Sequence, residues 1–178
     1  MFPVWLSKLI HSYNMANSSI ISIAKNKIIK EFIKDEAIVN AIHSSKISVD
    51  TPEKLINTHI FDYNQNPHTL NDVDTFITVE VSIPESYYWE KTYVHPVVEI
   101  YIISHEKHMK VDNVPKITMN RNDYLSTLID KKLNGKSGFG ISELTLKSNV
   151  GGATQMDYLY RKMIFEGTDF NNSLCEEE

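Results

Sequence analysis

The sequence predicts an α+β fold: a mostly antiparallel four-stranded sheet flanked by helices, in the order α-α-β-β-α-β-β. Apolar residues recur at helical spacing before residue 44 and again after residue 120, whereas elsewhere they alternate with polar residues as in strands. The predicted strands form two pairs on either side of one helix, which favours antiparallel pairing. With 178 residues, the chain suits one domain over 17–171, with an N-terminal arm at 1–16 and an acidic tail at 172–178.

Two helices are predicted between residues 17 and 43. Asn17 or Ser18 can cap the first, and Asp35 can cap the second, shorter one. The apolar stripe of the first helix is Ile21, Ala24, Ile28 and Phe32. We expect the lysines between these positions to stay in solvent; they are Lys25, Lys27, Lys30 and Lys34.

Residues 44–74 have few periodic apolar positions and are predicted to form a long irregular loop, with a short extended piece at Ile60, Phe61 and Tyr63 before a turn at Asn66-Pro67. From Thr75 the period changes to two, which predicts a half-buried strand ending before Pro84. Residues 97–103 are apolar on both faces, so this strand is expected in the middle of the sheet, covered on both sides.

The best-marked element is a helix from about Asn120 to Leu133. Asn120 and Asp123 resemble a capping box, and Asn134-Gly135 supplies a left-handed stop. A strand with one polar face is predicted around residues 143–147, followed by a loop at Gly151-Gly152. The last strand is predicted from about Tyr158 to Glu166.

Two apolar segments are candidate contact surfaces for a subunit or partner. The arm at 1–16 has apolar residues on one helical face, which indicates either a helix packed on its own domain or an arm that docks on a neighbour. The connection at 85–93 is rich in aromatic residues, which form either a cap over the core or a contact surface. The candidate contact residues are Trp5, Leu6, Leu9, Tyr87, Tyr88, Trp89 and Tyr93.

Charge and composition exclude several classes of protein. The formal net charge is −5, which gives no general electrostatic footprint for nucleic acid. The one cysteine, Cys175, cannot form an internal disulfide. No apolar run has the length to cross a bilayer, and residues 1–10 lack the basic start of a signal peptide, so we expect a cytoplasmic protein without membrane contact.

The residue patterns do not point to catalysis, so we expect no enzyme and no cofactor. His105 and His108 have a spacing that binds metal only on a helix, and here they follow a strand; we expect solvated turn histidines and no metal. Cys175 lies beside glutamates that disfavour its thiolate. Gly135, Gly138 and Gly140 follow a helix and precede a strand, the reverse of a phosphate-binding loop.

The region 97–171 resembles small neck or tail-completion proteins of tailed bacteriophages. The stretches that carry the likeness are 98–105 (VEIYIISH), 121–130 (RNDYLSTLID), 133–135 (LNG), 138–144 (GFGISEL), 160–165 (YRKMIF) and 169–171 (DFN). Upstream, 57–61 (NTHIF) followed by Pro67 is similar to the entry to the family's first strand. The chain is longer than the family pattern in its N-terminus and in 44–74, which leaves open a terminator, a stopper or another ring of the neck.

The resemblance implies a structural virion protein, a tail terminator-like subunit that forms a ring at the head–tail junction and joins tail tube to neck. Its expected partners are copies of itself in a six- or twelve-fold ring, neighbouring neck, portal or tail-tube proteins, and genomic DNA that passes the lumen without sequence-specific binding. The expected location is the virion, and the host cytoplasm during assembly. The alternative function is a monomeric adaptor that binds one protein through residues 1–16 and 85–93.

Overall fold

The computed structural model describes residues 18–44, 47, 50–65, 73–84, 93–154 and 157–170, with the backbone alone for residues 93, 169 and 170. The helices are α1 (Ser18–Lys34), α2 (Glu36–Ile42) and α3 (Arg121–Leu133), with short 3-10 turns η1 (Pro52–Leu55) and η3 (Glu106–His108). The strands are β1 (Ile60–Phe61), β2 (Thr75–Ser82), β3 (Tyr93–Val94), β4 (Val97–His105), β5 (Thr145–Ala153), β6 (Tyr158–Glu166) and β7 (Asp169–Phe170).

The main sheet has five strands in the order β1-β2-β4-β6-β5, and β3 pairs with β7 in a separate two-stranded sheet. The α+β class predicted from the sequence is confirmed. The β3–β7 sheet was not expected, and the main sheet has one strand more than expected. That strand is β1, the short extended piece foreseen at Ile60 and Phe61, which pairs parallel to β2. All other pairs are antiparallel, and β4 is central, with Ile100 opposite Val79 of β2 and Met163 of β6.

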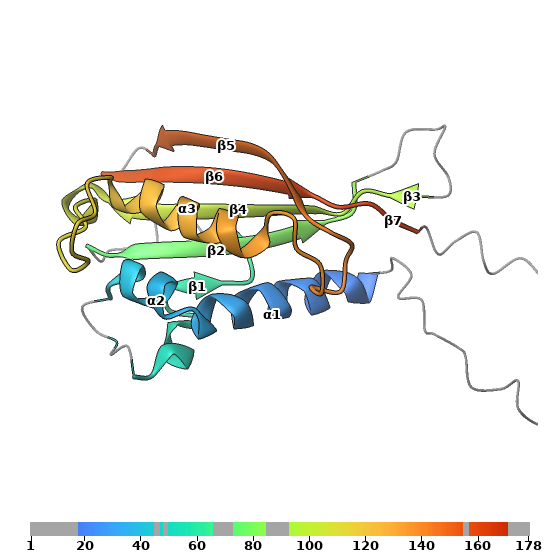
Figure 1. Cartoon of the computed structure of the whole chain (residues 1–178), viewed down its shortest axis with the longest axis horizontal. Coiled ribbons are helices and arrows are strands. Elements are labelled where there is room, and N and C mark those ends of the chain that lie inside the picture. Colours follow the sequence, from blue (N-terminus) through green and yellow to red (C-terminus); the bar gives the residue numbers. More distant parts are fainter. Residues whose placement is uncertain are drawn as a thin grey trace, which may run out of the picture.

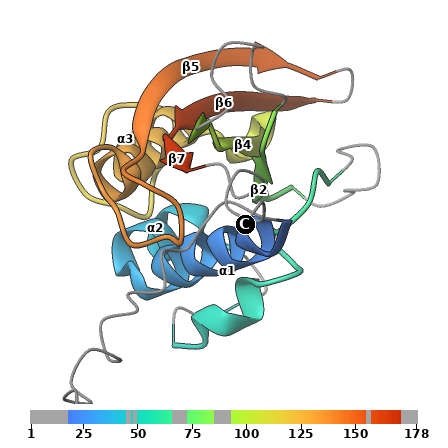
Figure 2. The same cartoon turned by 90° about the vertical axis from the view of Figure 1, so that its right-hand side faces the viewer.

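The three helices cover one face of the sheet (Figure 1; Figure 2). α1 packs against β2, whereas α3 packs against β4 and β6 and contacts α2. Alternate strand residues point into this layer, so that Val79, Ile100 and Met163 are fully buried with Ile28 and Phe32 of α1. Burying this apolar surface is the main stabilising contribution to the fold.

The opposite face of the sheet is only partly apolar. A small second cluster, Phe61, Phe76, Ile103 and Tyr158, is buried there. Further along, Lys162 of β6 pairs with Glu99 of β4 at 3.0 Å and lies 5.1 Å from the centre of the Tyr101 ring. The expectation that β4 is covered on both sides therefore holds for one face and for only part of the other.

The caps predicted at Asp35 and Asn120 are confirmed, whereas the cap predicted at Asn17 or Ser18 stays a prediction, because Asn17 lies outside the described residues. The Asp35 side chain accepts hydrogen bonds from the backbone N–H groups of Ala37 and Ile38 at the start of α2. Asn120 accepts from the N–H of Asp123 at the start of α3, and Gly135, just past its end, has a φ of 68°.

Two local predictions are wrong. Gly151 and Gly152 lie within β5, which runs on from the predicted strand to Ala153. Gly152 marks a close side-chain approach and not a loop, because a Cβ there would lie only 2.5 Å from the Tyr160 ring of the neighbouring strand. Lys25 does not remain in solvent: its amine pairs with Glu80 of β2 at 2.6 Å and donates to the backbone carbonyl of Asp62, with 15% of its side chain exposed.

Candidate functional site: a lysine-lined groove

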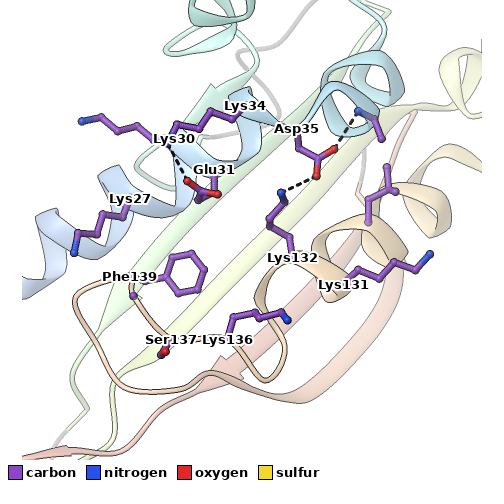
Figure 3. Close-up of a pocket in the computed structure, with 13 residues that line it drawn as sticks. Lys27, Lys30, Glu31, Lys34, Asp35, Lys131, Lys132, Lys136, Ser137 and Phe139 are labelled. Atoms are coloured by element: carbon purple, nitrogen blue, oxygen red, sulfur yellow. Dashed lines mark hydrogen bonds and ion pairs between the residues drawn. The ribbon is translucent and has the colours of Figure 1, made fainter.

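A surface hollow lies between α1, α3 and the loop that follows α3 (Figure 3). Its volume is about 750 Å³. It is lined by six lysines, two carboxylates and a few small or apolar residues. The lysines are Lys27, Lys30, Lys34, Lys131, Lys132 and Lys136; the carboxylates are Glu31 and Asp35; the apolar residues include Ala37, Leu128 and Phe139.

The loop after α3 forms one wall of the groove because glycines allow it to turn back towards α1. Gly138 and Gly140 have φ values of 101° and 89°, which only glycine adopts without strain. A Cβ on Gly140 would also lie 2.9 Å from the side chain of Ile23. Between them Phe139 is 5% exposed and packs into the main core, so its ring is part of the floor. The glycines are thus a helix stop and linker, as predicted.

One ion pair ties the two sides of the groove together. Lys132 of α3 reaches across to Asp35, with its amine 2.9 Å from a carboxylate oxygen (Figure 3). Burial raises the pKa of Asp35, but Lys132 and the N–H groups of Ile38 and Ala37 outweigh this, so that the pKa lies below its ordinary value. Asp35 is therefore a carboxylate at neutral pH and unavailable as a proton donor.

A second polar cluster lies at the other end of the sheet, within the fold. Asp74 accepts from His59 at 2.9 Å, and the Thr75 hydroxyl lies 2.8 Å from the Ser104 hydroxyl and 2.9 Å from Nδ1 of His108. Asp74, Thr75 and Ser104 are at most 1% exposed. Although a hydroxyl, an imidazole and a carboxylate come together here, the hydroxyls are closed off from a substrate.

His108 is the most perturbed titratable group in this cluster. Burial and the positive charge of Arg121 lower its pKa to about 4, and the nearby Asp74 opposes this only in part. His108 is therefore neutral at physiological pH. The prediction of solvated turn histidines is wrong for His108, whose side chain is 15% exposed, because it faces the buried Thr75.

Arg121 holds the chain around this cluster. It is fully buried, and its guanidinium donates to the backbone carbonyls of His108, Lys110 and Ala41 at 2.6–2.7 Å. A fourth, longer contact of 3.4 Å reaches the side-chain oxygen of Asn113. Burial lowers the pKa of Arg121, an effect that Asp112 and Asp74 oppose. Arg121 therefore joins α3, the end of α2 and the loop after η3.

Of the contact residues predicted from the sequence, the structure describes only the backbone of Tyr93. Trp5, Leu6, Leu9, Tyr87, Tyr88 and Trp89 lie outside the described residues. Tyr93 begins β3, and its backbone is opposite Phe170 of β7.

The histidine pair offers no metal site. His105 Nδ1 accepts from the N–H of Lys107, and its ring meets Tyr158 edge-on, whereas His108 faces Thr75. Within the described ranges no group of three or more His, Cys, Asp or Glu residues could hold a metal ion.

Sequence reasoning missed the groove because its lysines come from two distant segments. Lys27, Lys30 and Lys34 were interpreted as a solvated helical face, and Lys131 to Lys136 were not singled out. The one available signal was the concentration of six lysines in these two segments of an acidic chain. Only the packing of α3 beside α1 and α2 shows that they share one surface.

Fold and groove together define a small α+β domain with a one-sided helical layer and a basic surface groove. The chain belongs to the YomW family, whose model matches residues 21–166. The family takes its name from a phage region of Bacillus, which indicates a phage-encoded protein. No curated protein matches the chain. None of the described helices is both long and apolar enough to span a membrane.

Proposed function

We propose that this chain is a non-enzymatic structural subunit of the phage particle, which assembles into a ring at the head–tail junction as a tail terminator-like protein. Membership of a family named from a phage region supports the phage part of this proposal. The resemblance of 97–171 to tail-completion proteins supports the place in the particle.

The observation that carries assembly is the edge strand β5. It is nine residues long, each of them exposed or half-buried, and no described strand pairs with its outer side. Such an edge offers unpaired N–H and C=O groups to another chain. Natural edge strands are usually protected by charged residues, proline or β-bulges. In β5 this protection consists of Lys147, which lies at the one register shift of the strand. The C-terminal half of β5 carries Val150, whose side chain is 51% exposed.

Light scattering on the full chain, followed by imaging of the same fraction on grids, tests this function. We expect a mass several-fold above 20.5 kDa and annular particles. Val150→Lys should lower that mass by placing a charge on the docking edge. Val73→Lys is the matched control, because Val73 is 48% exposed and lies before β2, away from β5; it should leave the mass unchanged.

A monomer at every concentration would contradict self-assembly and favour the adaptor. An equal loss of mass in both variants would show that assembly does not use β5.

A further inference from the structure

The groove concentrates positive charge on an acidic protein. Its six lysines and two carboxylates give a formal charge of +4, so the rest of the chain, whose total is −5, carries −9. Two lysines are neutralised locally: Lys34 pairs with Glu31 at 3.1 Å and Lys132 with Asp35 at 2.9 Å. The other four, Lys27, Lys30, Lys131 and Lys136, have no ion pair among the described residues.

Helix stability explains only part of this set. Lys34, Lys131 and Lys132 lie in the last turns of α1 and α3, where a cation compensates the helix dipole. Lys27 and Lys30 lie further from the end of α1, and Lys136 is in the loop, so the dipole does not account for them. Their positions around one hollow point to an anionic ligand.

The chemistry of the groove favours a short acidic peptide over nucleic acid. Its aromatic residue, Phe139, is buried and cannot stack on a base. It has no arginine to grip a phosphate with two hydrogen bonds, because Arg121 is in the core and Arg161 pairs with Asp123. An extended duplex would also meet the negative charge of the rest of the molecule. A peptide can instead place carboxylates on the lysines and apolar side chains on Ala37 and Leu128.

We propose that the groove binds the acidic C-terminal segment 171–178 of a neighbouring copy, a contact that rests on the assembly proposed above. The segment (NNSLCEEE) has a charge of −3, no basic residue and one leucine. Its eight residues can extend to roughly 27 Å. It follows β7, which runs outwards at one end of the molecule (Figure 1). This direction favours a groove on the next copy over the groove of the same chain.

The single cysteine makes this contact measurable, because Cys175 immediately precedes Glu176. A short reagent that couples a thiol to an amine is attached to Cys175 in the full chain, and unlabelled and ¹⁵N-labelled copies are mixed. Mass spectrometry then identifies the linked lysines and whether the two peptides come from different copies. We expect mixed-isotope links to Lys27, Lys30, Lys131 or Lys136, and few to the exposed Lys107, Lys110 and Lys147.

The matched variants separate specific docking from general attraction. Replacing Glu176, Glu177 and Glu178 by Gln should lower the yield of groove links on the order of tenfold, because three surface ion pairs are lost. The same charge change at Glu53, Glu106 and Glu143, which are exposed, should leave it unchanged. About 1 M salt, which shortens the screening length to about 3 Å, should abolish the links.

Links within one copy only, or links spread evenly over all exposed lysines, would overturn the proposal. So would a labelled 20-base-pair DNA duplex that binds the full chain and is lost in Lys27→Gln/Lys30→Gln, because the groove would then be a nucleic-acid site. If light scattering shows a ring and no mixed-isotope groove links form, this proposal fails while the proposed function stands. A chain that stays monomeric would contradict both this proposal and the proposed function.

Discussion

At the scale of single residues, the described structure depends on a few polar side chains that are buried with their partners. Arg121 and His108 are the clearest, since both face the interior and each touches segments far apart in sequence. A buried polar group without its partner costs far more than its hydrogen bond contributes. Substitutions here should therefore change stability more than any change on the surface.

The lowered pKa of His108 predicts that the protein loses stability in mild acid. Between pH 6.5 and about 4 the unfolded chain binds a proton at His108 and the folded chain does not, so the free energy of unfolding falls as the pH falls through this window. The full shift corresponds to about 3 kcal/mol, and partial exposure to solvent reduces this to about 1–2 kcal/mol. Urea unfolding at pH 7.0 and pH 4.5 measures it.

His108→Gln should remove this part of the pH dependence, since glutamine does not titrate. All other residues are the same in both proteins, so the difference between the two pH profiles isolates His108. An unchanged difference between pH 7.0 and pH 4.5 in the variant would show that His108 is protonated normally in the fold.

The two arginines of the chain form a matched pair. Arg121→Leu should lower the free energy of unfolding by at least about 3 kcal/mol, because three buried carbonyls lose a charged donor. Arg161 is one quarter exposed and pairs with Asp123. Arg161→Leu should therefore lower the free energy of unfolding by about 1 kcal/mol or less. Chemical unfolding at neutral pH compares them, and equal costs would contradict the structural role given to Arg121.

At the scale of elements, side-chain caps decide where the helices begin. Asp35 is the single residue between the end of α1 and the start of α2. Its ion pair with Lys132 also holds α3 beside that junction. One carboxylate thus links three helices across the groove. Its two roles can be separated because asparagine caps a helix as well as aspartate does.

Asp35→Ala should cost about 1–2 kcal/mol of stability, because it removes both the cap and the ion pair. Asp35→Asn keeps the cap and should cost only about 0.5 kcal/mol at neutral pH. Because the pKa of Asp35 is lowered in the fold, its contribution is present above pH 3.8 and is lost as the pH falls below it. Urea unfolding of both variants at pH 7 and pH 3 measures this, and equal costs at pH 7 would rule out a capping role.

At the scale of the whole molecule, the fold class and most elements could be predicted from local patterns. The period-two run of β2, the apolar β4 and the cap at Asn120 each act within one segment, so periodicity was sufficient. Parallel pairing of β1 was beyond such reasoning, because two residues carry no periodic signal. The groove was beyond it too, because Lys27 and Lys136 line one hollow only in the folded chain, where α3 packs against α2.

The burial of His108 had the same cause, since it depends on Arg121 and Asp74 from other segments. What local patterns show is which residues prefer solvent or core. Local patterns do not show which solvated residues become neighbours in the fold. The candidate site consists of such neighbours.

The unequal edges of the sheet limit how many copies can join through them. The edge at β1 and β2 is occupied by the chain itself, since Lys25 and the N–H of Asn64 both bind Glu80 there. Of the two edges of the main sheet that the structure describes, this leaves β5. Pairing β5 of one copy with β5 of another uses the same surface twice, so it closes at two. A ring of six or twelve then requires a second, unlike contact on every copy. A stoichiometry of two, measured after the 171–178 segment is neutralised, would therefore identify the pair of copies from which the ring is built.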